Sequence, residues 1–211
     1  MARLMAQDNH DFPPGAFERI DEGDDAEFYA PPRLVTHIDD AAIEALRGFY
    51  ASVLPAGGTV LDLMSSWVSH LPGDMEFAQV IGHGMNAAEL AANPRLTRHF
   101  VQDLNRDPVL PLGDAACDAA LCCASVQYLT RPVEVFAEVR RVLRPGGLFI
   151  VSHSNRCFPT KAVAIWRALD WRRQANLVGV YLERAGFEGI AARVLANGMA
   201  GDPLVAVVGS A

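Results

Sequence analysis

Apolar residues along this chain fall into two patterns that alternate from about residue 40 onward. Short, nearly continuous apolar runs bounded by turn residues are typical of strands buried in a sheet. Such runs lie at 59–64, 77–82, 99–104, 117–124, 148–152, 189–195 and 203–208. Several stretches between them repeat apolar residues at helical spacing. The pattern therefore predicts an α/β fold, with a mostly parallel sheet and helices on both faces.

Four stretches have the spacing of amphipathic helices. The first begins at Asp39 and ends at the P-A-G-G of 55–58, and its apolar positions are Ile43, Leu46, Phe49, Tyr50 and Val53. The others are expected at 86–93, 131–144 and 159–185, the last with room for two helices. Asn86 has the side chain of a helix N-cap. In open α/β sheets ligands bind outside the carboxyl ends of the strands, so the residues that follow strands are the candidate site.

The first 38 residues have a different character from the rest. Residues 1–27 are polar and acidic, with D-E-G-D-D-A-E at 21–27, and we expect a solvated tail, with a recognition arm as the alternative. Residues 28–38 bring aromatic residues, Arg33 and His37 up to the first long helix. We therefore divide the chain into an N-terminal tail with a possible lid segment at 1–38 and one domain at 39–211.

Composition narrows the class of partner. Of the 211 residues, 51% are hydrophobic and 20% are charged, which suits one domain with a substantial core. The formal net charge of −7 gives no general attraction to nucleic acid or to an anionic membrane. We expect a small-molecule substrate, no nucleic-acid partner and no membrane partner.

The cysteines indicate the compartment. They stand at positions 117, 122, 123 and 157, which matches neither a disulfide framework nor zinc-ligand spacing, so we expect no metal. Cys122 and Cys123 should point to opposite faces of one strand. Free thiols, the lack of an apolar signal segment and the lack of ~18 uninterrupted apolar residues favour a cytoplasmic protein.

Five motifs follow one another in a fixed order: V-L-D-L at 60–63, V-I-G-H-G-M-N at 80–86, V-Q-D-L at 101–104, L-P-L-G-D-A-A-C-D-A-A at 110–120 and E-V-R-R-V-L-R-P-G-G-L-F-I-V-S at 138–152. In this order they resemble the class I S-adenosylmethionine-dependent methyltransferases of type 11, over roughly residues 40–155. The resemblance implies a Rossmann-like, seven-stranded sheet whose last strand is antiparallel, with S-adenosylmethionine as the cofactor. The glycine fingerprint and Tyr-x-x-x-Lys pair of a short-chain NAD reductase are absent.

The resemblance also implies which residues hold the cofactor. Asp62 would stand near the methionine ammonium, whose charge it complements, although an acid here also serves to cap the next turn. Asp103 would accept a hydrogen bond from the adenine amino group, with Leu104 beside the ring. The other cofactor-binding residues that we expect are Met64, Ser65, Ser66, Met85, Asn86 and Ser125.

The turn after the first strand departs from the family pattern. Its glycine positions are occupied by Met64, Ser66 and Val68. A left-handed backbone at such residues costs on the order of 1–3 kcal/mol. We therefore expect the loop to follow a different path, with Ser65 and Ser66 supplying donors at the start of a short helix.

A second departure follows the second strand. Gly84 stands where relatives place a carboxylate for the ribose diol. Asn86 is then either a neutral substitute for that carboxylate or simply the cap of the following helix.

Acceptor-side candidates follow the fourth and fifth strands. S-V-Q-Y at 125–128 contributes Tyr128 and lacks the N/D-P-P-Y/F signature of amino methylation on nucleobases or glutamine. S-H-S-N-R-C-F at 152–158 contributes His153 as a base and Arg156 as an anion clamp; a surface histidine and a structural salt bridge are the alternatives. Residues expected to bind substrate or close the pocket are Tyr29, His37 and Asn155, and docking onto the sheet is the alternative for the first two.

These observations predict an enzyme that transfers a methyl group from S-adenosylmethionine to a small molecule by direct displacement, as a monomer or homodimer. The alternative from another class is a non-catalytic, methyltransferase-like binding protein with an altered cofactor loop. A dinucleotide reductase is the third possibility, and bound NAD(P) would reveal it.

Overall fold

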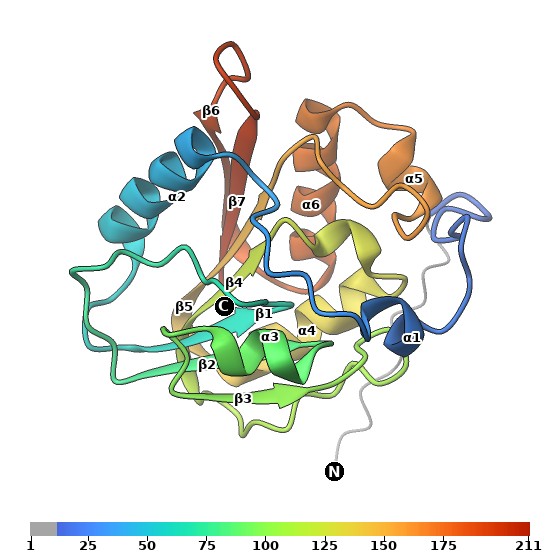
Figure 1. Cartoon of the computed structure of the whole chain (residues 1–211). Helices are drawn as coiled ribbons and strands as arrows, with labels where there is room; N and C mark the ends of the chain where they lie inside the picture. The colour runs from blue at the N-terminus through green and yellow to red at the C-terminus, as the bar shows by residue number, and fades with distance from the viewer. Residues whose placement is uncertain (1–11) are drawn as a thin grey trace.

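The computed structural model describes residues 12–211 and contains one seven-stranded sheet in the order β3-β2-β1-β4-β5-β7-β6 (Figure 1). The strands are β1 (Thr59–Leu63), β2 (Gln79–Gly84), β3 (Arg98–Val101), β4 (Cys117–Cys123), β5 (Leu143–His153), β6 (Glu188–Ala196) and β7 (Leu204–Ser210). Neighbouring strands from β3 to β5 are parallel, and β7 is antiparallel to both β5 and β6. This topology confirms the Rossmann-like sheet with an antiparallel last strand.

Helices cover both faces of the sheet (Figure 1). They are α1 (Asp25–Tyr29), α2 (Asp40–Val53), α3 (Ala87–Ala92), α4 (Pro132–Val142), α5 (Ala164–Arg167) and α6 (Trp171–Arg184). One face packs against α4 and α6 through Phe136, Phe149 and Tyr181, and the other packs against α2 through Leu46 and Tyr50. Within residues 12–211, no helix combines the length and the apolar character needed to cross a membrane.

The helices form where the sequence supplies a cap and an apolar face. Asp39 accepts a hydrogen bond from the backbone N–H of Ala42 at the start of α2, and four of the five apolar positions expected there are buried. Asp170 caps α6 in the same way, and Gly186 follows that helix with φ of 85°. Burial of each large apolar side chain stabilises the fold by roughly 1.5–3 kcal/mol.

Four strands differ from their expected bounds by two or more residues at one end; of these, the third ends at Val101, three residues early, and the seventh ends at Ser210, two residues late. The second lies two residues later than predicted; Phe77, which precedes it, is partly buried against the cluster that contains Leu46 and Tyr50 of α2. The fifth begins at Leu143, where the helix before it ends, and the P-G-G of 145–147 forms a bulge between the pairs Cys117–Leu143 and Ala119–Leu148. Glycine at 146, with φ of 80°, permits that bulge.

Residues 12–38, named here the N-terminal segment, are docked on the domain. The expectation of a solvated tail is therefore wrong for 12–27; residues 1–11 lie outside the described part. The backbone of Ala16 and Glu18 accepts hydrogen bonds from Ile165 and Ala164, both at 2.8 Å. In Figure 1 the segment runs from α1 past α3 to the start of α2. It thus crosses the carboxyl ends of the strands.

Candidate functional site

A cavity of about 130 Å³ lies at the carboxyl ends of β1, β2 and β4, beneath the N-terminal segment. We name it the strand-end cavity. Its position is where open α/β sheets bind ligands. It brings together most of the residues singled out from the sequence: Tyr29, His37, Asp62, Met64, Ser65, Ser66, Met85, Asn86, Asp103, Leu104, Ser125 and Tyr128.

Three predicted residues lie outside the cavity lining. His153 is fully buried at the end of β5 and meets Trp166 edge-on at 5.0 Å, so it is neither a base at the cavity nor a surface histidine. Burial lowers its pKa to about 4. Arg156 donates to Asp202 at 2.8 Å, which is the structural salt bridge of the alternative reading. Asn155 is exposed and contacts Ser154 at 3.1 Å.

Asp62 is the buried acid of the cavity. Its side chain is 3% exposed, accepts a hydrogen bond from the Ser65 hydroxyl at 2.6 Å, and has no ion-pair partner within residues 12–211. Burial raises its pKa to about 6. A buried carboxylate without a cation is costly, and a cationic ligand would relieve that cost.

The loop after β1 keeps a left-handed turn without glycine. Met64 has φ of 54°, so the expectation of a different path is wrong at this residue. Two hydrogen bonds to His83 hold this turn: the Met64 N–H donates to His83 Nδ1 at 3.0 Å, and the Ser65 N–H donates to the His83 carbonyl at 2.6 Å. No helix follows, so Ser65 and Ser66 do not stand at a helix N-terminus.

Backbone strain is concentrated around this cavity. Of the four non-glycine residues with positive φ in 12–211, three line it: Met64, His70 and Ala124. Each such residue costs on the order of 1–3 kcal/mol and persists only where the surroundings impose it. Strained residues often gather at ligand-binding sites, which agrees with the position of this cavity at the strand ends.

His83 was not predicted as a site residue. Its Nδ1 accepts from Met64, so its Nε2 carries the proton and donates to the Gln102 carbonyl at 2.9 Å. Burial lowers the pKa of His83 to about 4, which keeps the ring neutral and the loop bonded at neutral pH. The sequence offered no signal beyond a histidine inside a strand.

Of the two alternatives for Asn86, the structure confirms the helix cap, and it also shows what lies beside Gly84. A Cβ added to Gly84 would stand 2.5 Å from the Ser65 carbonyl oxygen, so the loop after β1 occupies the space of a side chain there. Asn86 caps α3 by accepting from the Glu89 N–H at 3.0 Å. Its amide nitrogen donates to the carbonyls of Tyr29 and Ala30, both at 2.9 Å. Its amide oxygen is therefore bonded to α3 and its amide nitrogen to the N-terminal segment.

The adenine-side residues expected after β3 line one end of the cavity. Asp103 accepts from the Asn105 N–H at 2.9 Å through one oxygen, and Leu104 is buried beside it. The Asn105 amide donates to Asp25 at 3.1 Å and to the Tyr128 carbonyl at 3.0 Å. Asn105 thus joins the loop after β3 to the N-terminal segment.

Glu89 on α3 is a second residue that sequence reasoning missed. One carboxylate oxygen accepts from the Arg33 backbone N–H and the other from the Ser66 hydroxyl, both at 2.6 Å. Nearby, the Trp67 indole donates to the Val35 carbonyl at 2.9 Å. These bonds close the N-terminal segment over the loop after β1. In the sequence Glu89 reads only as an acid in the first turn of a helix.

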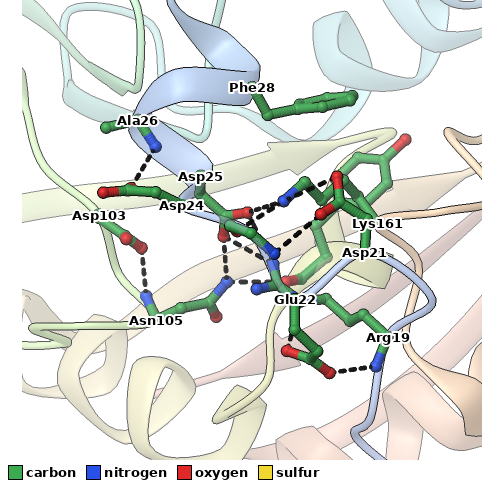
Figure 2. Close-up of polar contacts among 12 residues, drawn as sticks. Arg19, Asp21, Glu22, Asp24, Asp25, Ala26, Phe28, Asp103, Asn105 and Lys161 are labelled. Atoms are coloured by element: carbon green, nitrogen blue, oxygen red, sulfur yellow. Dashed lines mark hydrogen bonds and ion pairs between the residues drawn. The ribbon is translucent and has the colours of Figure 1, made fainter.

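An ion cluster fixes the other end of the segment (Figure 2). Asp25, 6% exposed, pairs with Arg19 at 2.7 Å and with Lys161 at 3.0 Å. Lys161 is 1% exposed and also donates to the Gly23 carbonyl at 2.8 Å. Burial alone would raise the pKa of Asp25, but Arg19, Lys161 and Asn105 together hold it below its usual value.

Aromatic rings form the remaining wall. The hydroxyl of Tyr128 accepts from the Phe158 N–H at 2.9 Å, and the two rings stack at 5.8 Å. His37 meets Phe158 edge-on at 5.6 Å. Burial raises the pKa of Tyr128 to about 12 and lowers the pKa of His37, so both are neutral at neutral pH.

The cavity residues fit the two ends of S-adenosylmethionine better than its middle. Asp62 offers an unpaired carboxylate to an ammonium, and Asp103 keeps acceptor capacity at the other end. For a ribose, Gly84 supplies no carboxylate, and the amide of Asn86 is already bonded. At about 130 Å³ the cavity is smaller than the roughly 300–1,000 Å³ of most ligand pockets, so the space seen here is too small to enclose S-adenosylmethionine.

Comparison with known proteins gives one domain match and short alignments to curated enzymes. Residues 67–151 match the family model described as a methyltransferase domain. The chain is 32% identical over 105 residues to a malonyl-[acyl-carrier protein] O-methyltransferase of Hahella chejuensis (strain KCTC 2396), covering 50% of this chain and 33% of that enzyme. The chain spans about a third of the length of the curated relatives that it matches.

Solved structures share the fold over most of the chain. A SAM-dependent methyltransferase from Aquifex aeolicus has a TM-score of 0.59 and 17% identity, covering 81% of this chain and 90% of that one. The [4+2]-cyclase SpnF has a TM-score of 0.61 and 18% identity, covering 85% of this chain and 88% of that one. At these identities the likeness is one of fold.

Proposed function

We propose that the chain is a class I S-adenosylmethionine-dependent methyltransferase and that it methylates a small molecule by direct displacement. The observation that carries this proposal is the unpaired, buried carboxylate of Asp62 in the strand-end cavity. A cationic amino acid end satisfies it, and Asp103 lies at the end of the cavity where an adenine amino group would be met. The relatives' names favour an oxygen atom as the acceptor.

The cofactor would supply an already activated methyl group when bound. The chain's own residues then have mainly to hold an acceptor in line with that methyl, at about 3–3.5 Å, and to exclude water. Tyr29, Tyr128 and Phe158 form an apolar wall suited to exclude water, and neutral His37 is available to accept a proton. His153 and Arg156, placed outside the cavity lining, are assigned no step.

We assign the N-terminal segment the role of a lid. Its bonds to Asn86, Glu89 and Trp67 can break together without disturbing the sheet, because every one of them joins the segment to a loop or to α3. Opening would enlarge the cavity to admit the cofactor, and closure would remove water from it. The four cysteines of residues 12–211 are free thiols, which agrees with the reducing cytoplasm that we propose as the location. We also propose that the protein acts as a monomer or homodimer.

Calorimetric titration with S-adenosylhomocysteine tests the function. We expect binding in the micromolar range typical of enzyme ligands. Asp103→Ala should weaken it about tenfold or more, because a hydrogen bond to a charged group is lost. Asp74→Ala, an exposed loop acid, is the matched control and should leave the affinity unchanged.

The competing outcomes are distinct. Wild-type protein that binds no S-adenosylhomocysteine would favour a non-catalytic, methyltransferase-like binding protein. NAD(P) absorbance in the purified protein would instead indicate a dinucleotide reductase.

The affinity should also depend on pH through Asp62. As pH falls through about 6, the carboxylate takes up a proton and loses its attraction for the ammonium, so binding weakens. Because this pKa lies above the usual 3.8, the same ionisation weakens the fold as pH rises to about 6. Asp62→Asn should abolish the pH dependence of binding near 6, measured by calorimetry on both proteins. A wild-type affinity that is flat across this range would contradict the assignment of Asp62.

A further inference from the structure

The strand-end cavity contains a cation that the proposed function does not use. Arg33, from the N-terminal segment, lines the cavity, and its Nη1 is buried without a hydrogen-bond partner in residues 12–211. Its Nη2 donates to the Phe28 carbonyl at 2.8 Å, which satisfies part of the guanidinium only. Within the described residues no carboxylate lies within ion-pair distance of this side chain.

Aromatic rings hold the guanidinium in place. Its central carbon lies 4.7 Å from the ring centre of Phe28, 5.8 Å from Tyr29 and 5.3 Å from Phe158. Rings stabilise a cation through their π faces but leave its N–H donors unused. The Nη1 end of the guanidinium, which has no hydrogen-bond partner in residues 12–211, therefore remains available for a ligand.

The acids around Arg33 are committed elsewhere. Glu89 accepts the Arg33 backbone N–H and the Ser66 hydroxyl, not the guanidinium. Asp25 is paired with Arg19 and Lys161. No acid that the structure describes therefore pairs with the Arg33 guanidinium to offset the free-energy cost of removing it from water.

We propose that Arg33 is the anion-binding residue of the strand-end cavity and pairs with a carboxylate of a bound small molecule. Guanidinium and carboxylate match in shape and form two parallel hydrogen bonds, which is the strongest pairing open to this side chain. The carboxylate has two possible sources, the amino acid end of the cofactor and an acid group of the acceptor. The first of these sources, the cofactor carboxylate, rests on the proposed function.

Arg33→Met tests the inference, because methionine keeps an apolar stem against the rings and removes the charge. Arg47→Met, an arginine on α2 that pairs with Glu44 at the surface, is the matched control. Calorimetry compares S-adenosylhomocysteine, which has the carboxylate, with 5′-methylthioadenosine, which lacks it. Saturation-transfer NMR follows weak binding of acetate.

Two results support the inference and identify the source. If Arg33→Met weakens S-adenosylhomocysteine about tenfold or more and leaves 5′-methylthioadenosine unchanged, the partner is the cofactor carboxylate. The second result has two parts. The affinity for S-adenosylhomocysteine is the same in all three proteins, and acetate binds to the S-adenosylhomocysteine complexes of wild type and Arg47→Met but not to that of Arg33→Met. The partner of Arg33 is then an acceptor carboxylate.

Two results overturn it. Equal weakening of both adenosine ligands would show that Arg33 acts only by docking the N-terminal segment, and no change in any ligand would show that it only packs. If the wild-type protein binds no S-adenosylhomocysteine, the proposed function fails, but the inference about Arg33 can still be tested by acetate binding to the ligand-free proteins. Loss of acetate binding in Arg33→Met alone supports the inference. Any other pattern of acetate binding overturns it.

Discussion

Asp25→Ala is expected to lower the free energy of unfolding by about 3 kcal/mol, the lower end of the range for breaking a buried ion pair. The change leaves Arg19 and Lys161 without the carboxylate that they share. The lower end applies because Lys161, only 1% exposed, keeps Asp21 at 3.2 Å and the Gly23 carbonyl. Chemical denaturation measures this loss.

The cost should appear first in the N-terminal segment. Lifting residues 12–38 lets water reach both cations, which is cheaper than unfolding the sheet. Hydrogen exchange should therefore rise in this segment and in the backbone of Ala164 and Ile165, which donate to it, while the amides of β1 and β4 stay protected. The affinity for S-adenosylhomocysteine should also fall, because the N-terminal segment covers the strand-end cavity.

Asp24→Ala is the matched control. Asp24 caps the short helix α1 by accepting from the Ala26 N–H and is half exposed, so its loss should cost about 1 kcal/mol or less. Equal effects of the two substitutions, or unchanged exchange in Asp25→Ala, would show that the buried cluster does not hold the segment.

Gly84→Asp, which places an acid where the family resemblance expects one after the second strand, is expected to destabilise this protein by about 3 kcal/mol. The new Cβ would lie 2.5 Å from the Ser65 carbonyl oxygen and 3.2 Å from Leu90. A backbone oxygen cannot rotate away, and the Ser65 N–H is bonded to the His83 carbonyl at 2.6 Å. We therefore expect lower stability in urea and weaker, not tighter, binding of S-adenosylhomocysteine.

Gly48→Ala provides the comparison for Gly84→Asp. Gly48 lies inside α2 and has open space around it, so alanine should stabilise the protein by roughly 0.5–1 kcal/mol. A stable Gly84→Asp protein with improved affinity would mean that the loop after β1 can leave the end of β2, contrary to the close packing seen here.

Much of the fold could be predicted from the residues because local signals agreed with the global pattern. The run T-V-L-D-L is apolar enough to be buried on both faces, and β1 follows it. Asp39 and Asn86 cap helices where an N-cap side chain precedes apolar spacing. Cys122 and Cys123 pack into different clusters, as adjacent residues on a strand must.

The site could be predicted only in part. Asp62 and Asp103 lie where the motifs indicate, because strand ends of a parallel sheet gather at one edge. Asn86 was correctly placed at the cavity, but its amide is engaged by the carbonyls of Tyr29 and Ala30, far away in sequence. Trp67 likewise bonds to the N-terminal segment.

The sequence by itself determined the order of strands and helices, the strand-end position of the cavity and the acids at its two ends. The first two depend on periodicity and on residues within a few positions of one another, and the two acids follow from the resemblance of the motifs V-L-D-L and V-Q-D-L to a known family. The tertiary structure alone decided that Met64 keeps a left-handed turn, because His83 supplies its hydrogen bond across strands. It also decided that residues 12–38 close the cavity, because Lys161 and Glu89 meet them only after folding. Such contacts join residues distant in the chain, and no local pattern encodes them.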